Sequence, residues 1–293
     1  MRNINAKLYI MFLINLDKNF TPFGTENEIS FQAFTFSGGE PHIKIQHFDT
    51  TQKVIITHRA NSFNDFGLII LTIDALKRMD VKEIELFIPY FPAARQDRVM
   101  IPGEPLSVKV YAAILNSLNL SKVYVFDAHS EVTPAVLNNC QVITNYKFIE
   151  RVIENIGEEV ILISPDGGAL KKIYKVSEYL GGVEVVEASK SRDVKTGKLK
   201  DFKVYTDDLQ GKPCLIVDDI CDGGGTFIGL AEALQKKNAG KLYLAVSHGI
   251  FNKGFDQLQI FEKIFTTNSF RDFNEEKLIV IDLNKINSIH YDK

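Results

Sequence analysis

Short runs of apolar residues alternate along the chain with segments in which apolar residues recur at helical spacing. The continuous apolar runs predict strands at 84–88, 123–126, 160–163, 183–186, 215–217, 242–246 and 277–283. The helical spacing predicts helices at 108–118, 146–156, 168–176 and 227–237. Continuous apolar strands that alternate with helices indicate parallel sheets that are covered on both faces.

This pattern occurs twice, before and after about residue 144, and predicts two α/β domains at 1–143 and 144–277. Whether residues 278–293, with the last predicted strand, complete the first domain stays open. The first 45 residues or so look richer in strands than in helices, and the polar stretch 189–208 is expected to be a mobile loop or ribbon.

Composition excludes several classes of protein. The chain has 293 residues, of which 45% are hydrophobic and 24% charged, as in a soluble globular protein. Its net charge of −3 provides no general attraction to nucleic acid or to an anionic membrane, so phosphate binding needs local sites. Three scattered cysteines form neither a disulfide framework nor a zinc cluster, which favours the cytoplasm. The apolar segment 8–16 is too short to span a bilayer and predicts a buried first strand.

The clearest local signal lies between Cys214 and Leu234, where a buried strand, a glycine-rich turn and an apolar helix follow one another. The residues of this segment that suit a ligand are Asp218, Asp219, Asp222, Gly223, Gly224, Gly225 and Thr226. Ligands of such sheets bind at the carboxyl ends of the strands, where glycines let backbone N–H groups converge on an anion. The helix start adds its dipole, and Thr226 is expected to cap the helix and to donate to phosphate.

The two carboxylates cannot bind phosphate, but they suit ribose hydroxyls or a metal ion. The segment therefore predicts a site for a phosphorylated sugar. The alternative is a tight turn with a solvated acidic edge, although three consecutive glycines cost more backbone entropy than a turn requires.

Further candidate residues carry charges that suit a nucleotide. Arg95 and Arg98 flank Gln96 and Asp97 just after a strand, where two guanidinium groups could clamp a triphosphate; the alternative is a surface salt bridge. The others, each with a purely structural alternative, are His129 and Asp166 after predicted strands, Lys190 and Arg192 in the polar stretch, and Phe36 as a stacking platform for a base.

Several segments resemble, in order and spacing, those of phosphoribosyl pyrophosphate (PRPP) synthetases, the ribose-phosphate pyrophosphokinases of nucleotide biosynthesis. The glycine-rich segment resembles the loop that these enzymes share with type I phosphoribosyltransferases. The segments specific to the synthetases are FSGGE at 36–40, IPYFPAARQDR at 88–98, EPLS at 104–107 with Lys109, DAHS at 127–130, SPDGGALKK at 164–172, SKSR at 189–192, SHGIF at 247–251 and TTNS at 266–269.

The resemblance implies two domains of the type I phosphoribosyltransferase kind with the active site between them, and a dimer or hexamer. It implies that ATP and Mg²⁺ bind through Phe36, Glu40, Arg95, Gln96, Asp97, Arg98, His129 and Asp166, the last two holding the metal. It assigns Lys190 and Arg192, with Arg98, to catalysis, and Asp218, Asp219 and the 222–226 turn to ribose 5-phosphate. The implied reaction moves a pyrophosphoryl group from ATP to the anomeric hydroxyl and releases AMP.

The sequence departs from the family in three places. Gly38 stands where the family usually has Asp, Gly223 stands where it usually has Thr, and FDTTQKVIITH at 48–58 replaces a stretch tied to subunit contacts and regulation. Gly223 is expected to leave a roomier pocket at the 5′ position. An acceptor such as ADP-ribose, whose phosphate carries a further group, is therefore an alternative to ribose 5-phosphate.

Two other classes remain. A phosphoribosyltransferase would need only the 218–226 segment and would leave Arg95 to Arg98 unexplained. A non-catalytic regulator of a partner synthetase should have lost catalytic residues, yet Lys190, Arg192 and His129 are present, as are Asp166 and the Asp218–Asp219 pair.

Overall fold

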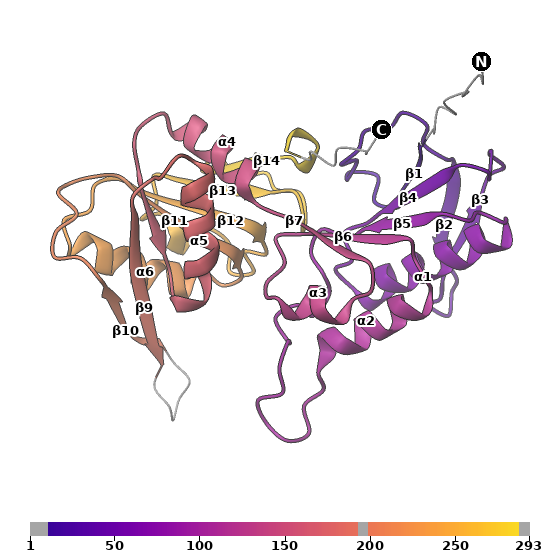
Figure 1. Ribbon diagram of the computed structural model, residues 1–293, viewed down its shortest axis with the longest axis horizontal. Helices are drawn as coiled ribbons and strands as arrows, with labels where there is room; N and C mark the ends of the chain where they lie inside the picture. The colour runs from indigo at the N-terminus through magenta and orange to yellow at the C-terminus, as the bar shows by residue number, and fades with distance from the viewer. Residues whose placement is uncertain (1–10, 193–198, 287–293) are drawn as a thin grey trace, which may run out of the picture. The chain divides into compact units, whose positions relative to one another are not determined.

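The computed structural model of the protein describes residues 11–192 and 199–286, without the side chains of 191, 192 and 199–201. The chain divides into two compact units, residues 1–143 and 144–293 (Figure 1). Among the described residues, no helix combines the length and the apolar character that crossing a bilayer would need.

The first unit is built on a five-stranded sheet in which every neighbouring pair is parallel. Its spatial order is β1 (Met11–Asn15), β4 (Lys53–Thr57), β5 (Ile84–Phe87), β6 (Lys122–Phe126) and β7 (Cys140–Ile143). β1 contains the described part of the predicted first strand, and its last three residues are buried as expected.

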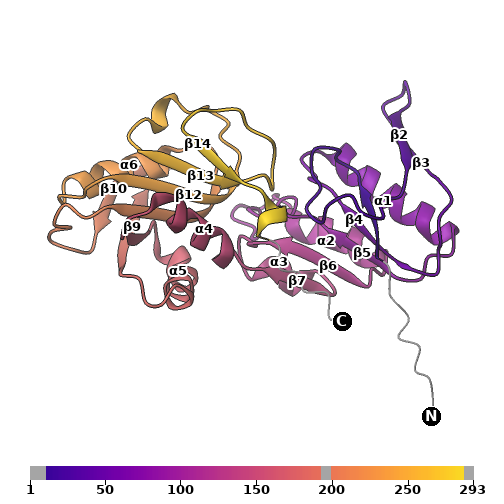
Figure 2. The same ribbon diagram turned by 90° about the horizontal axis from the view of Figure 1, so that it is seen from above.

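Helices and a hairpin cover this sheet: α1 (Phe63–Arg78), α2 (Ser107–Ser117), α3 (Val132–Val136), and the antiparallel pair β2 (Phe31–Thr35) and β3 (Pro41–Ile45). α1 begins at a capping box, in which Ser62 accepts from the Asp65 N–H and Asp65 accepts from the Ser62 N–H. Its face with Phe66, Ile69 and Ile73 is fully buried in the core. The hairpin packs against α1 and projects beyond it (Figure 2).

The second unit contains a seven-stranded sheet, parallel except at one edge. Its spatial order is β10 (Leu199–Val204), β9 (Val185–Arg192), β8 (Ile161–Ser164), β11 (Cys214–Cys221), β12 (Leu242–Gly249), β13 (Lys263–Thr267) and β14 (Leu278–Ile281). β11 pairs in parallel with β8 and β12, and its first four residues are buried. The predicted α/β class with mainly parallel sheets is confirmed.

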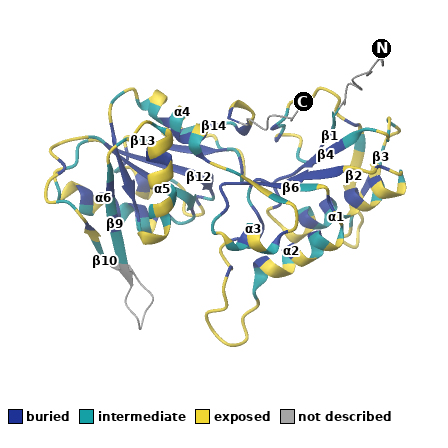
Figure 3. Ribbon diagram, in the orientation of Figure 1, coloured by how far each residue is buried: buried dark blue, intermediate teal, exposed yellow. Residues whose placement is uncertain are grey.

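Three helices flank this sheet: α4 (Tyr146–Ile156), α5 (Gly167–Tyr179) and α6 (Gly225–Gln235). The short 3₁₀ turns η1 (Asp256–Leu258) and η2 (Leu283–Lys285) complete the unit. The parallel strands of both units are mostly buried, whereas the outer faces of the helices are exposed (Figure 3). This distribution is typical of sheets covered on two sides.

The structure decides two points that the sequence left open about the second unit. β14 pairs in parallel with β13, register Thr267 to Ile281, so this strand belongs to the second sheet and does not complete the first. Residues 287–293 lie outside the described part of the chain. The polar stretch after Ser189 is a ribbon in its described portion, since β9 and β10 pair antiparallel there.

Two segments singled out by sequence, SHGIF and TTNS, join β12 to β13 through buried polar groups. The Thr267 hydroxyl donates to the Ser247 carbonyl at 2.7 Å, and the Ser269 hydroxyl reaches the same carbonyl at 3.0 Å. The His248 Nδ1 lies 2.7 Å from the Ser269 Oγ. Because buried polar groups need such partners, these residues hold the sheet together at its carboxyl edge.

Candidate functional site

The carboxyl edge of the first sheet brings two of the predicted segments side by side. The Ile88 N–H donates to the Tyr124 carbonyl at 3.0 Å, and the Phe126 N–H donates to the Pro89 carbonyl at 2.9 Å. The segments that follow β5 and β6 therefore leave the sheet next to each other. Two non-glycine residues there, Ala93 and Asp127, have left-handed φ angles of 56° and 39°. Such backbone strain is common at functional sites.

Asp97 and Arg98 form the centre of this edge. The Asp97 side chain is 3% exposed and the Arg98 side chain 71% exposed, and Arg98 Nε donates to Asp97 Oδ1 at 3.0 Å. The hydrogen bond from Arg98 holds the pKa of Asp97 below its usual value against the effect of burial, and the Ser130 hydroxyl and the charge of His129 add to it. Asp97 therefore orients Arg98, whose terminal nitrogens have no partner among the described residues.

The neighbouring predicted residues have simpler environments. The side chains of Arg95 and Gln96 are exposed, and the backbone of Gln96 accepts a long hydrogen bond from Val108 N at 3.4 Å, close to the start of α2. His129 is half-buried and lies close enough to Asp97 to affect its pKa. The structure therefore brings Asp97, Arg98 and His129 together at one edge.

Phe36 and Glu40 lie at the tip of the β2–β3 hairpin, which packs on α1. The Phe36 side chain is 52% exposed, so the alternative of a core phenylalanine is wrong. Its ring contacts Phe34 at 5.0 Å and His42 at 5.4 Å between centroids, and all three belong to this hairpin. These contacts leave about half of the phenyl group open to solvent.

The Glu40 carboxylate lies against the backbone of Gly38. A Cβ atom at Gly38 would come within 2.5 Å of Glu40 Oε2 and 2.8 Å of Oε1. These atoms are the end of a flexible side chain, so a larger residue at position 38 would require only that the carboxylate move.

In the second unit the paired acids lie at the end of β11. The Asp219 N–H donates to Asp218 Oδ1 at 2.9 Å. The pKa of Asp218 is raised well above its usual value, first by burial and then by the negative charges of Asp219 and Asp166. Two carboxyl groups this close favour a ligand that donates hydrogen bonds or carries positive charge.

The glycine-rich turn ends in the left-handed residue Gly224, which has a φ of 77° and forms the N-cap of α6 without a side-chain cap. Thr226 is the second helical residue, so the expectation that it caps the helix is wrong. The cap falls at Gly224, whose left-handed φ favours glycine, and a Cβ there would also lie only 3.0 Å from Leu258 Cδ2. A Cβ at Gly225 would meet nothing within 4 Å, so the turn is open on that side.

Asp166 and Lys190, predicted for metal binding and catalysis, form an ion pair in this structure. Lys190 Nζ lies 2.7 Å from Asp166 Oδ2, and Asp166 Oδ1 caps α5 by accepting from Gly168 N and Ala169 N. Burial opposes ionisation of Asp166, but Lys190 and the two N–H groups outweigh it, so its pKa is lowered. The side chain of Arg192, at the end of β9, lies outside the described residues.

The chemistry of these groups fits Mg²⁺ in part. An ionised, partly exposed carboxylate such as Asp166 is the oxygen donor that Mg²⁺ prefers. No three His, Cys, Asp or Glu side chains within the described ranges gather closely enough to hold a metal alone.

Sequence reasoning missed two features of these edges. His58 follows β4 and is 6% exposed, and neither ring nitrogen has a hydrogen-bond partner among the described residues. Burial lowers its pKa, so the ring is held neutral. Lys253 lies beside Gly223, because a Cβ there would be 3.3 Å from Lys253 Cδ and Cε. The signal for Lys253 was its place in the segment after the β12 strand, two residues beyond SHGIF.

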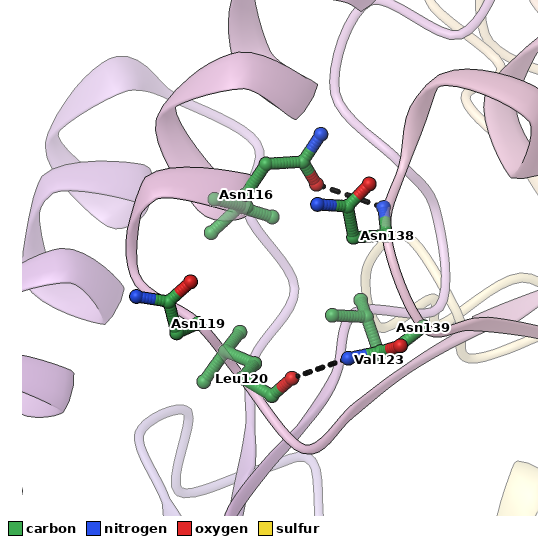
Figure 4. Close-up of a pocket in the computed structure, with 7 residues that line it drawn as sticks. Asn116, Asn119, Leu120, Val123, Asn138 and Asn139 are labelled. Carbon is green, nitrogen blue, oxygen red and sulfur yellow. Dashed lines mark hydrogen bonds between the residues drawn. The ribbon is translucent and has the colours of Figure 1, made fainter.

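A cavity of about 120 Å³ lies at the opposite edge of the first sheet, where β6 begins. Figure 4 shows asparagine side chains around it; Asn116 Oδ1 accepts from Asn138 N at 2.8 Å, and Asn139 Nδ2 donates to the Leu120 carbonyl at 2.9 Å. The cavity is smaller than ordinary ligand pockets and contains none of the predicted site residues. It is therefore separate from the candidate site.

The Asp218→Asn variant should be more stable than the natural protein at alkaline pH. A folded-state pKa above the unfolded value means that stability is lost as pH rises from the ordinary pKa to the raised one. Removing this carboxyl should raise the melting temperature at pH 8 by about 2–4 °C. The gain should become small near pH 4, where Asp218 is protonated in the folded state and about half protonated in the unfolded state.

Differential scanning calorimetry in EDTA, without sugar phosphate, measures this effect. Asp207→Asn, at an exposed site of the same unit, is the matched control and should change the melting temperature little at either pH. An unchanged or lower melting temperature for Asp218→Asn at pH 8 would contradict a raised pKa.

Known families match both units. The model for the N-terminal domain of ribose phosphate pyrophosphokinase matches residues 26–118, and that for the phosphoribosyl transferase domain matches residues 141–274. The structure also matches the crystal structure of phosphoribosylpyrophosphate synthetase from Mycobacterium smegmatis, with a TM-score of 0.79 and 22% identity over 94% of this chain and 95% of that one. At that identity the match shows the fold.

Two relatives are more similar in sequence. The ribose-phosphate pyrophosphokinase of Aquifex aeolicus is 31% identical over 264 residues, which cover 85% of this chain and 82% of the relative. That of Pyrococcus furiosus is 34% identical over 227 residues, 75% of this chain and 77% of the relative. Together with the two matched domains, these identities show that the chain belongs to the ribose-phosphate pyrophosphokinase family of transferases.

Proposed function

We propose that the protein transfers the β,γ-pyrophosphoryl group of ATP to the anomeric hydroxyl of a ribose 5-phosphate unit and releases AMP. The observation that carries the proposal is the carboxyl edge of the second sheet. There, paired acids in the last half of β11 and an open glycine turn lie on the same edge as the Asp166–Lys190 pair. The paired acids suit sugar hydroxyls, the glycine turn suits a sugar phosphate, and the Asp166–Lys190 pair suits a nucleotide phosphate with its metal ion.

The acids and the glycine turn would position the sugar. Asp218 and Asp219 would accept hydrogen bonds from the ribose hydroxyls, and the backbone N–H groups around Gly225 would bind the 5′-phosphate. A sugar fixed in this way presents its anomeric hydroxyl in one orientation. Positioning of that kind contributes much of the rate in phosphoryl transfer.

In the proposed reaction the anomeric oxygen forms a bond to the β-phosphorus of ATP. The bond from that phosphorus to the oxygen of the α-phosphate breaks, and AMP leaves with the electron pair while the hydroxyl proton passes to water. Lys190, Arg192 and Arg98 would stabilise the charge on the phosphoryl oxygens. The family resemblance assigns Asp166 and His129 as the residues that would hold Mg²⁺, and the ion would supply further positive charge to the triphosphate.

The identity of the acceptor, the oligomer and the compartment are also proposals. Ribose 5-phosphate is the first choice, and ADP-ribose is the alternative that Gly223 raised. The three cysteines are free thiols, which supports a cytoplasmic location. A dimer or hexamer stays a prediction from the family resemblance.

Incubation with ATP, Mg²⁺ and either acceptor should release AMP in step with a pyrophosphorylated sugar. Mass spectrometry of the sugar product and a chromatographic assay of AMP measure both sides of the reaction. A mixture without acceptor controls for hydrolysis of ATP. If neither acceptor yields AMP above that control, the proposed reaction is wrong.

Lys190→Ala should retain the fold and lower turnover at least ~100-fold, because it removes a cation from the transferring group. The pair with Asp166 is partly exposed, so its loss should cost about 1 kcal/mol of stability or less. Lys212→Ala is the control, since it removes an exposed lysine paired with Glu184 at 2.9 Å. Near-normal kcat in Lys190→Ala would remove the catalytic role.

Phe36→Ala should raise KM for ATP by about 5- to 100-fold and leave KM for the acceptor unchanged, because stacking on a base contributes ~1–3 kcal/mol. Phe63→Ala, at a 63% exposed aromatic residue of α1, is the control. Steady-state kinetics with each substrate varied in turn give both constants. An equal change in the two constants, or none, would show that Phe36 is not the adenine platform.

A further inference from the structure

We propose that Lys253 binds the 5′-phosphoryl group of the acceptor and replaces the side-chain hydroxyl that position 223 lacks. The inference rests on the proposed function, because it takes the glycine turn after β11 as the sugar-phosphate site. It concerns a residue outside that turn, on the segment that follows β12.

The segment with Lys253 is fastened to the glycine turn by the backbone. The N–H groups of Ile250 and Phe251 donate to the Cys221 carbonyl at 2.8 and 3.1 Å, and the Asn252 N–H donates to the Asp222 carbonyl at 3.0 Å. Three hydrogen bonds to two consecutive carbonyls fix one segment against the other. The position of Lys253 is therefore set by the fold.

The backbone on both sides of Lys253 has left-handed conformations that fix the course of this segment. Phe251 has a left-handed φ of 46° although its large side chain is buried, and Gly254 follows with a φ of 69°. Arg271 Nη2 donates to the Phe251 carbonyl at 3.3 Å and stabilises the corner. A bulky residue in this conformation costs roughly 1–2 kcal/mol, so the surrounding contacts have to maintain it.

Gly223 and Lys253 are sterically matched. A Cβ atom at Gly223 would lie 3.3 Å from Lys253 Cδ and Cε and 3.3 Å from Asn252 Oδ1, tighter than an ordinary contact. In this structure the aliphatic part of Lys253 therefore occupies the space beside Gly223. Because Nζ is bonded to Cε, the ammonium group lies close to the same turn.

Electrostatics favour a phosphate as the partner of this lysine. Lys253 is exposed and pairs with no carboxylate among the described residues. Acidic side chains lie beside the turn, Asp219 in β11 and Asp222 at its start, and their negative charges would repel a phosphate. A helix start provides only about half a positive charge, so a full cation beside the turn offsets this repulsion.

Lys253→Met should raise KM for the phosphorylated acceptor by about 10- to 100-fold, the value of one charge-assisted hydrogen bond, with KM for ATP within twofold. The measurement uses whichever of ribose 5-phosphate and ADP-ribose the natural enzyme accepts. With unphosphorylated ribose, the variant and the natural enzyme should have the same kcat/KM. Lys236→Met, just beyond the other end of α6, controls for the change in charge. An unchanged acceptor KM, or an equal loss on ribose, would overturn the proposal.

A pair of substitutions tests the contact directly. Gly223→Ala should raise the acceptor KM in the natural background, because the new methyl group displaces Lys253. In the Lys253→Ala background the same change should add less than twofold. Additive effects would show that Gly223 and Lys253 act independently and would contradict the proposed contact.

Calorimetric titration with ribose 5-phosphate, without ATP, keeps this inference separate from the proposed reaction. The natural protein should bind it about 10- to 100-fold more tightly than Lys253→Met. Absence of AMP formation would refute the reaction alone, whereas equal affinities would refute the role of Lys253 alone.

Discussion

Parallel pairing on both sides of β11 is the constraint on which the second unit depends. A strand held by β8 and β12 has to leave the sheet at the same edge as its neighbours. Groups that are far apart in sequence are therefore neighbours in space. They are the carboxyl groups of Asp218 and Asp219, the helix cap at Asp166 and the corner at Phe251. The same rule places Asp97 and His129 together in the first unit, where β5 and β6 are adjacent.

The features that sequence predicted well depend on local chemistry. Continuous apolar runs marked most of the buried strands, and the segment 146–156 coincides with α4. The glycine-rich turn was recognisable because only glycine adopts the conformation of Gly224 at little cost. The capping box at Ser62 and Asp65 was an available signal for α1, a helix that the apolar pattern alone did not predict.

The features that sequence did not predict depend on contacts between distant residues. By its apolar pattern alone, the short strand β14 would fit the edge of either sheet. Only its pairing with β13 shows that it belongs to the second sheet. The sequence predicted Thr226 as the cap, whereas the cap is Gly224. The contact with Leu258 that disfavours a side chain at Gly224 comes from a residue 34 positions later, so local sequence could not reveal it. Gly38 and Gly223 are alike in that each lies against the charged side chain of another residue. Glu40 lies beside Gly38, and Lys253 lies beside Gly223.

The Asp166–Lys190 ion pair has a consequence for the order of events at the site. Under the proposed function, one ammonium group would have to serve both a carboxylate and a nucleotide phosphate, so the lysine would exchange one counter-ion for the other during the reaction. In this structure the carboxylate holds the lysine, and the helix cap of α5 keeps that carboxylate in place. Any metal ion bound with the triphosphate would compete for the same carboxylate and would free the lysine for the phosphate. Binding of the nucleotide and release of the lysine would then be coupled.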